Sequence, residues 1–223
     1  VSDDGNGQTY SFDPAIAGVG AHILTYTVNA QVLEDEVEVF PLPTVSFGNQ
    51  QGICVNAGVQ SGRSGGSPAG GTYSGSGVTD DNNGETFSFD PQIPGIGTYT
   101  LTYAYTDGNG CTSSSTTTIE VFALPSVSFT APLDLCVDTG VQSGLGGGTP
   151  SGGVYSGPGV TDDGNGQTFS FDPATAGTDM HTITYDYTDS NGCNSSADDQ
   201  ITVFDLPDVN FSDPGDFCVD AGV

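Results

Sequence analysis

Short runs in which apolar and polar residues alternate recur along the chain. Residues 100–105, for example, place Leu101, Tyr103 and Tyr105 on one face and smaller or polar residues on the other. A two-residue period is typical of a half-buried β-strand. Within one stretch of the sequence, strands are expected at residues 44–47, 53–55, 71–74, 86–89, 100–105 and 116–122. No stretch shows the 3.6-residue period of an amphipathic helix, so the pattern predicts an all-β protein.

An internal repeat organises these strands. Cys54, Cys136 and Cys218 follow one another at intervals of 82 residues, and Cys111 and Cys193 keep the same interval. An 82-residue copy is long enough to fold as a small β-sandwich, and its short strands and frequent turns suit an immunoglobulin-like fold. The predicted fold class is therefore all-β, with tandem immunoglobulin-like β-sandwich domains that recur with an 82-residue period.

The repeat also predicts where the domains lie. We expect residues 1–41 to be the C-terminal half of a repeat, residues 42–123 and 124–205 to be complete repeats, and residues 206–223 to be the N-terminal part of a further one. Because both ends fall in mid-repeat, the sequence is expected to be a window on a longer array.

The charge of the chain excludes several classes of binding partner. It holds 28 acidic side chains but one basic one, Arg63, which gives a formal net charge of -27. A chain with one cation cannot neutralise a phosphate backbone, so nucleic-acid binding is excluded. Anionic membrane surfaces should repel it. The longest apolar stretch, residues 15–24, is about half the length of a membrane-spanning helix, so no membrane insertion is expected within this segment.

The residues predict no catalytic site. The two histidines, His22 and His181, occupy equivalent positions in their repeats, and Tyr99 takes that position in the middle copy. A catalytic or metal-binding histidine should not be replaced by tyrosine, so both are interpreted as strand residues. Carboxylates occur throughout the chain, and no pair stands out as a glycosidase-type acid and nucleophile. The chain is therefore predicted not to be an enzyme.

The cysteines predict a disulfide in each complete repeat. Cys54 and Cys111 are 57 residues apart, as are Cys136 and Cys193, and we expect these two pairs to be bonded. Closing loops of this length should stabilise each domain by about 3–4 kcal/mol. Disulfides at fixed spacing indicate an oxidising, extracellular setting. The alternative is that the cysteines are buried free thiols in a reducing compartment.

Calcium is the one cofactor that the sequence suggests. Asp, Asn and Gly recur in equivalent loops, where several hard oxygens can surround one ion. The candidate ligands are Asp3, Asp4, Asn6, Asp80, Asp81, Asn83, Asp162, Asp163 and Asn165. The alternative is that Asp, Asn and Gly simply form turns, with diffuse cations screening the charge.

Four motifs carry a resemblance to a known family. They lie in residues 155–163 (Tyr-Ser-Gly-x-Gly-Val-Thr-Asp-Asp), 169–173 (Phe-Ser-Phe-Asp-Pro), 184–193 (ending Thr-Asp-x-Asn-Gly-Cys) and 203–207 (Val-Phe-x-Leu-Pro). They resemble tandem immunoglobulin-like repeats of very large Bacteroidota surface and secreted proteins, including gliding-motility-type adhesins. The first copy departs from the pattern, because residues 29–37 lack the Asn-Gly-Cys turn.

The resemblance implies export, through the type IX route, and a place at the bacterial cell surface. The predicted function is that of a non-enzymatic extracellular structural protein, a repeat stalk or filament of an adhesin whose partners are the neighbouring repeats of the same long chain. One alternative is a module that binds a glycan, mineral or ice surface. Another is a self-assembling fibre in which residues 1–41 are completed by residues 206–223 of an identical chain.

Overall fold

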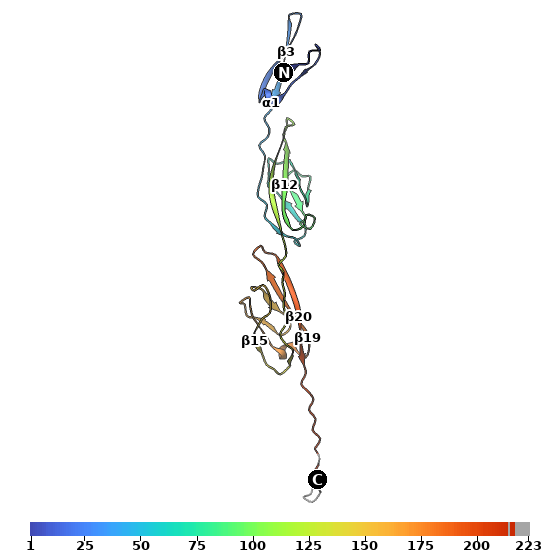
Figure 1. Ribbon diagram of the computed structural model, residues 1–223, viewed down its shortest axis with the longest axis vertical. Helices are drawn as coiled ribbons and strands as arrows, with labels where there is room; N and C mark the ends of the chain where they lie inside the picture. The colour runs from blue at the N-terminus through green and yellow to red at the C-terminus, as the bar shows by residue number, and fades with distance from the viewer. Residues whose placement is uncertain (214, 217–223) are drawn as a thin grey trace. The chain divides into compact units, whose positions relative to one another are not determined.

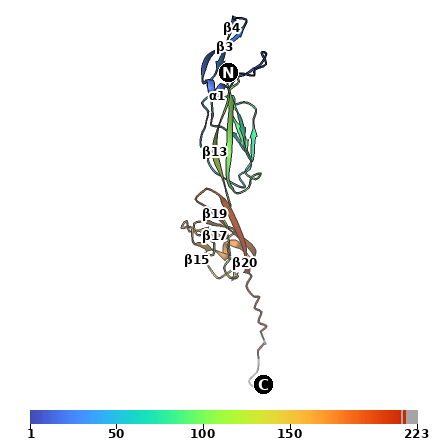
Figure 2. The ribbon, with the colours of Figure 1, turned by 45° about the horizontal axis from the view of Figure 1, so that its top comes forward.

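The structure is a computed structural model that describes residues 1–213 and 215–216. The chain divides into two compact units, Val1–Ala123 and Leu124–Val223, and strands dominate both (Figures 1 and 2). The first unit contains an N-terminal segment followed by a β-sandwich, and the second contains another sandwich. The all-β, immunoglobulin-like fold class predicted from the alternating pattern is confirmed.

The N-terminal segment is built from two small antiparallel pairs. Strands β1 (Ser2–Asp3) and β2 (Tyr10–Ser11) form one, and β3 (Gly20–Val28) and β4 (Gln31–Val39) form a long hairpin. Between the pairs lies the four-residue helix α1 (Pro14–Ala17). Asp13 caps this helix by accepting hydrogen bonds from the backbone N–H groups of the first turn, and Pro14 suits the first helical position.

The first sandwich consists of two sheets and a ribbon. Its strands are β5 (Ser46–Phe47), β6 (Ile53–Cys54), β7 (Gln60–Arg63), β8 (Gly66–Ser67), β9 (Thr72–Ser74), β10 (Val78–Asp80), β11 (Phe87–Phe89), β12 (Gly97–Thr106) and β13 (Thr112–Phe122). One sheet has the order β10-β11-β7 and the other the order β6-β13-β12-β9, while β5 pairs with β8. All six strands that the alternation predicted are present, and residues 107–110 form the turn between β12 and β13.

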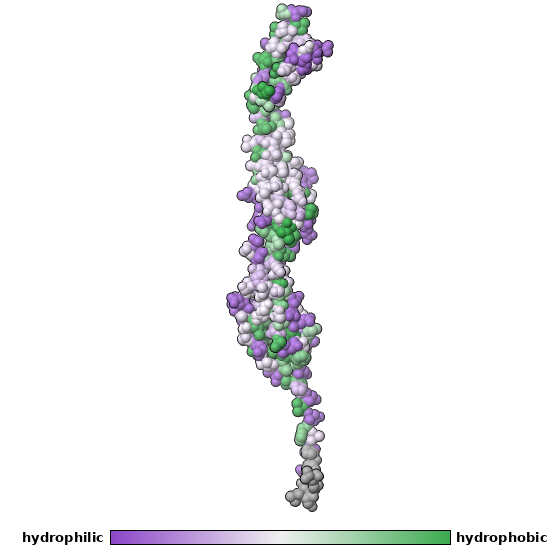
Figure 3. All heavy atoms as spheres, in the orientation of Figure 1, coloured by the Kyte–Doolittle hydropathy of each residue, from purple (hydrophilic) through white to green (hydrophobic). Residues whose placement is uncertain are grey.

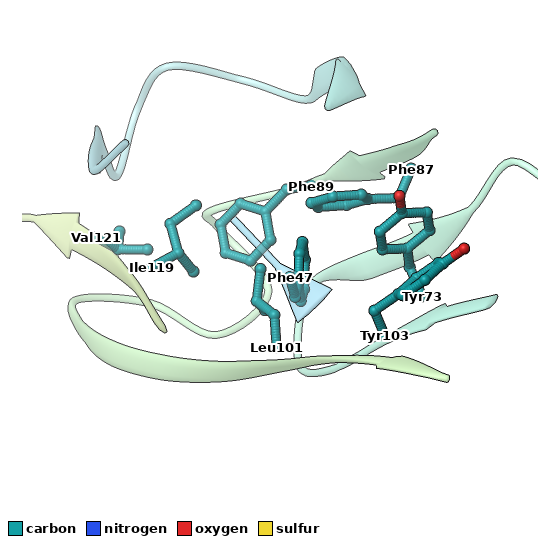
Figure 4. Close-up of a cluster of buried hydrophobic side chains, with 8 residues drawn as sticks. All are labelled: Phe47, Tyr73, Phe87, Phe89, Leu101, Tyr103, Ile119 and Val121. Atoms are coloured by element: carbon teal, nitrogen blue, oxygen red, sulfur yellow. The ribbon is translucent and has the colours of Figure 1, made fainter. Parts of the chain in front are cut away.

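The core of the first sandwich is an aromatic cluster between the two sheets (Figure 4). Its buried members are Phe47, Tyr73, Phe87, Phe89, Leu101, Tyr103, Ile119 and Val121. The ring of Tyr73 lies 4.6 Å from that of Tyr103 and 4.7 Å from that of Phe87, measured between centroids. Tilted aromatic pairs at these distances add to the stabilisation that burial alone supplies.

The second sandwich repeats this arrangement. Its elements are β14 (Leu135–Cys136), β15 (Gln142–Leu145), β16 (Val154–Ser156), β17 (Val160–Asp162), β18 (Phe169–Phe171), α2 (Pro173–Ala176), β19 (Asp179–Thr188) and β20 (Asn194–Phe204). The sheets have the orders β14-β20-β19-β16 and β15-β18-β17. Its core contains Phe129, Tyr155, Phe169, Phe171, Ile183, Tyr185, Ile201 and Val203.

The glycine-rich stretch of each sandwich wraps around one buried tyrosine. A Cβ atom on Gly66 would lie 2.5 Å from the ring of Tyr103, and one on Gly71 would lie 2.4 Å from the carbonyl oxygen of Ala104. In the second sandwich, a Cβ atom on Gly148 would lie 2.6 Å from the ring of Tyr185. Only glycine fits where backbone and ring approach so closely, so these stretches serve packing.

Candidate functional site

The loops predicted to bind calcium are tight turns whose oxygens bond to their own chain. Oδ1 of Asp80 accepts a hydrogen bond from the backbone N of Asn82 at 2.7 Å. Oδ2 of Asp81 accepts one from the hydroxyl of Thr86 at 2.6 Å, and Oδ1 of Asn83 accepts one from the backbone N of Thr86 at 2.8 Å. These contacts are those of Asx turns, in which Asp and Asn satisfy the backbone locally.

The other two loops close in the same way. Asp162, Asp163 and Asn165 form a turn that ends at Thr168, and Asp3, Asp4 and Asn6 form one that ends at Thr9. The structure thus brings the predicted ligands together three at a time. Within the described residues, however, no three or more His, Cys, Asp or Glu side chains are placed to hold a metal ion. Calcium binding therefore stays a prediction, and the turn geometry explains the residues without it.

Asp80 and Asp162 have a second role that the sequence reasoning missed. Oδ2 of Asp80, on β10, accepts a hydrogen bond from the backbone N of Tyr73, on β9. The equivalent bond between Asp162 and the backbone N of Tyr155 measures 2.8 Å. Because β9 and β10 belong to different sheets, this carboxylate ties the two layers of the sandwich together. The signal was the constant spacing of Tyr and Asp, seven residues apart in both copies.

Two further carboxylates hold the segment that precedes β14 in the second sandwich. Oδ2 of Asp199 accepts a hydrogen bond from the backbone N of Ala131 at 2.9 Å, and Oδ1 of Asp134 accepts one from the backbone N of Thr202 at 2.7 Å. The bond from Ala131 holds the pKa of Asp199 below its usual value. The first sandwich has Gly52 and Thr117 at the corresponding positions, so the repeat pattern offered no signal for this pair.

The cysteine pairs predicted within each repeat are wrong. Cys54 lies beside Phe122, the last residue of β13, because β6 pairs in parallel with the end of that strand. Cys111 directly precedes Thr112, the first residue of the same strand. Eleven residues rising roughly 3.3 Å each separate these two ends, so the Cα atoms lie roughly 30 Å or more apart. A disulfide spans about 4.4–6.8 Å between Cα atoms.

The second sandwich places its cysteines in the same way. Cys136 lies beside Phe204 at the end of β20, and Cys193 directly precedes the start of that strand. The predicted Cys136–Cys193 pair is therefore excluded for the same reason. The bonding states agree, because Cys111 and Cys136 are free thiols while Cys54 and Cys193 are disulfide-bonded.

The two histidines are strand residues, as predicted, and each holds a turn. Nε2 of His22, on β3, lies 2.8 Å from the carbonyl oxygen of Gly18, and Nε2 of His181, on β19, lies 2.8 Å from that of Gly177. Each of these glycines ends a short helix. In the middle copy, the Tyr99 hydroxyl donates to the carbonyl oxygen of Pro94, five residues earlier, at 2.6 Å. A shared structural contact explains why tyrosine can replace histidine.

The single basic side chain is also used structurally. Arg63, on β7, donates from Nη2 to the carbonyl oxygen of Gln51 at 2.8 Å and from Nε to Oε1 of Gln50 at 3.2 Å. Burial lowers its pKa. In the second sandwich Leu145 stands at the equivalent position and packs against the core. Arg63 therefore anchors a loop of its own sandwich.

Among known proteins, similarity to this chain is found in solved structures. No protein-family model matches the chain, and no curated protein matches it. Among solved structures, it is similar to a Ca2+-stabilized adhesin with which an Antarctic bacterium binds ice, at 15% identity and a TM-score of 0.41 over 83% of this chain and 57% of that one. It thus spans little more than half of that protein.

Two other solved structures show the same likeness. Fibronectin(III)-like modules of Clostridium thermocellum CbhA match at 13% identity and a TM-score of 0.32, over 76% of this chain and 100% of theirs. Drosophila N-cadherin EC1-4 matches at 13% identity and a TM-score of 0.33, over 77% and 52%. These likenesses are weak, and the all-β fold class rests on the strand order of the chain itself. In the described part of the chain, no helix is long and apolar enough to cross a membrane.

Proposed function

We propose that this chain is part of a non-enzymatic extracellular stalk or filament of a bacterial surface adhesin. The observation that carries the proposal is that each sandwich has its own aromatic core. The Asp, His and Arg side chains, which could take part in chemistry, instead hold turns, cap a helix or tie the two sheets together. The disulfide-bonded state of Cys54 and Cys193 supports an oxidising compartment. Residues 42–123 and 124–205 are the complete repeats in this proposal, flanked by part-repeats at 1–41 and 206–223. We also propose an origin in the Bacteroidota and export by the type IX route, and both rest on the sequence resemblance.

A stalk should bear force, so the decisive experiment is single-molecule stretching of the chain in a reducing buffer. Unfolding one repeat of 82 residues releases roughly 25 nm of chain at about 3.5 Å per residue, after its folded length is subtracted. We expect two unfolding steps of this equal size. A chain that lengthens smoothly, without force peaks, would contradict a mechanical role.

The predicted calcium binding has its own test. The melting temperature of the chain should rise with added Ca2+ and fall in excess chelator if the loops around Asp80, Asp162 and Asp3 bind the ion. Identical melting curves in both conditions would remove calcium and leave these loops as turns. The result does not bear on the stalk proposal, because that proposal rests on the two aromatic cores and not on these loops.

A specific observation favours one second candidate, the self-assembling fibre. The N-terminal segment exposes residues whose equivalents are core residues. Apolar residues also lie on the face of this segment that Figure 3 shows. Tyr10 and Tyr26 are 57% and 52% exposed, whereas the equivalent Phe87 and Tyr103 are fully buried. Phe211, which is equivalent to the core residue Phe47, is 84% exposed.

The exposed residues at the two ends of the chain are equivalent to residues that contact one another inside a complete repeat. In the complete first repeat, the ring of Phe47 lies 6.0 Å from that of Phe87 and 6.2 Å from that of Tyr103. The fibre candidate therefore seats Phe211 of one copy against Tyr10 and Tyr26 of a second copy. Light scattering should then show concentration-dependent assembly that Phe211→Asp abolishes.

A matched control tests whether that assembly is specific. Ile93→Asp places the same charge on another exposed apolar position, 67% exposed in the first sandwich, and should leave assembly unchanged. A strict monomer at all concentrations would remove the fibre candidate and leave the stalk proposal standing. The surface-binding alternative stays a prediction.

A further inference from the structure

We propose that the N-terminal segment, residues 1–41, carries a binding groove for an extended peptide segment of the pattern Pro-x-Gly-Gly-x-Tyr, supplied by a further repeat of this kind. The pattern occurs at residues 68–73 and 150–155, in the glycine-rich stretches of the two complete sandwiches. There it packs against residues whose equivalents line the groove. Binding of this kind does not depend on the stalk role, and it differs from the fibre candidate, which places the segment around Phe211 against the same two tyrosines.

The groove has a volume of about 770 Å³ and is lined by both strand pairs of the N-terminal segment. Its lining includes Tyr10, on β2, and Tyr26, on β3, and both side chains are more than half exposed. In the first sandwich the equivalent residues are Phe87 and Tyr103, and the ring of Tyr73 packs against both, at 4.7 and 4.6 Å between centroids. The groove therefore offers two aromatic walls of the kind that hold the tyrosine of the pattern.

The polar partners of that tyrosine are also present. In the first sandwich, the backbone N of Tyr73 donates to Oδ2 of Asp80, and its hydroxyl donates to the carbonyl oxygen of Glu85 at 3.0 Å. The second sandwich repeats both bonds. The equivalent residues, Asp3 and Gln8, line the groove. Among the described residues, Oδ1 of Asp3 accepts from its own turn, which leaves Oδ2 available to the backbone of an added strand.

The two glycines of the pattern bond to a carbonyl and a hydroxyl that have equivalents at the groove. In the first sandwich, the first glycine donates from its backbone N to the carbonyl oxygen of Gly84 at 2.7 Å, and the second donates to the hydroxyl of Tyr103 at 2.8 Å. The equivalents, Gly7 and Tyr26, bond to each other, because the Tyr26 hydroxyl donates to the carbonyl oxygen of Gly7 at 3.2 Å. Binding exchanges this one exposed bond for the bonds of both glycines. A Cβ atom on the second glycine would lie 2.5 Å from the ring of Tyr103, so the groove selects glycine there.

The open edge of β3 completes the site. In the first sandwich, β9 carries the tyrosine of the pattern and pairs antiparallel with residues 102–104 of β12. The equivalent residues 25–27 lie on β3, which among the described residues pairs with β4 alone. An extended segment can therefore add a strand at this edge, with main-chain hydrogen bonds for affinity and the tyrosine for specificity. Because Tyr73 and Tyr155 are buried in their own sandwiches, the segment comes from a further repeat.

A synthetic peptide of residues 60–77, carrying a fluorescent label, tests the groove on the full chain by fluorescence anisotropy. We expect saturable binding of this peptide. The Tyr73→Ala peptide should bind at least about tenfold more weakly, because it loses the ring and the hydroxyl that the groove receives. Both peptides carry Arg63, so attraction to the acidic chain is the same for each. Equal binding of the two peptides, or no saturable binding, would overturn the proposal.

Two variants of the chain locate the site. Tyr26→Ala removes one aromatic wall and the hydroxyl, and it should abolish saturable binding. The matched control Ile93→Ala shortens another exposed apolar side chain, outside the groove, and should bind the peptide as the wild type does. Neither residue belongs to a sandwich core, so both variants keep the two folded sandwiches. Undiminished binding to Tyr26→Ala would place the peptide elsewhere and refute the site.

A second peptide separates this proposal from the fibre candidate. Residues 206–213 contain Phe211 but no Gly-Gly-x-Tyr, so we expect this peptide neither to bind saturably nor to displace the 60–77 peptide. If it binds in the groove while the 60–77 peptide does not, the groove takes the fibre segment and the present assignment is wrong. Single-molecule stretching tests the stalk separately, because it measures the two complete sandwiches and not the groove.

Discussion

Replacing Tyr103 and Tyr185 by phenylalanine removes one oxygen atom from each sandwich and leaves the ring volume unchanged. Both side chains are fully buried. The Tyr103 hydroxyl accepts a hydrogen bond from the backbone N of Gly71 at 2.8 Å and donates one to the carbonyl of Pro68. Tyr185 bridges its own glycine-rich stretch in the same way. The substitution therefore leaves two backbone groups without their partner in each sandwich.

The expected cost follows from the burial of those groups. The bond from Gly71 is buried, and an orphaned buried N–H costs roughly 1–3 kcal/mol. The bond to Pro68 is only partly buried, so water can replace the hydroxyl there at little cost. We expect a loss of about 2 kcal/mol per sandwich, which lowers the melting temperature of a domain of this size by about 8–16 °C.

Scanning calorimetry of the double variant Tyr103→Phe/Tyr185→Phe measures this loss in both sandwiches, whichever melts first. The matched control is Tyr105→Phe/Tyr187→Phe, because these two half-buried hydroxyls make no hydrogen bond to the described residues. The control should stay within about 0.5 kcal/mol of the wild type. If the two double variants melt together, the tyrosine bridges contribute no net stability and the reasoning fails.

Three other predictions follow from the geometry. Gly71→Ala should cost about 3 kcal/mol by denaturant titration, since its Cβ would strike backbone, whereas Gly108→Ala, with open space around it, should be neutral. Asp80→Ala should cost about 1–3 kcal/mol through loss of the tie between the sheets. Because the folded-state pKa of Asp199 is lowered, its stabilisation is present above about pH 4 and lost as the pH falls. Asp199→Asn should therefore flatten the melting profile between pH 5 and pH 3.

The alternating pattern predicted the strands and much of the core, because a buried sheet face leaves a two-residue period. Leu101 and Tyr103, assigned to one face, are 1% and 0% exposed. Strands built from small polar residues escaped prediction. The run Gln-Ser-Gly-Arg of β7 (Gln60–Arg63) carries no apolar period, and it is a strand because β11 pairs with it.

The same limit explains the error in the cysteine pairs. The pattern began the last strand of the repeat at residue 116, because residues 112–115 are Thr and Ser without an apolar member. In the structure β13 begins at Thr112 and runs for 11 residues. The added length carries Cys111 to the far end of the sandwich from Cys54. The two cysteines are 57 residues apart in the sequence. Whether they lie close enough to form a disulfide depends on the length of the strand that separates them, which the pattern underestimated.

The hydrogen bonds show how the structure uses the carboxylates behind its net charge of -27. With one arginine and no lysine, carboxylates cannot be neutralised by side chains, and many instead accept bonds from backbone N–H groups. Asp13 caps a helix, Asp107 binds the turn that precedes β13, and Asp80 ties two sheets. These contacts give backbone N–H groups an acceptor, and the carboxylates need no cationic side chain to make them. An acidic surface is therefore compatible with folded, repeated sandwiches, and its remaining repulsion is screened by salt.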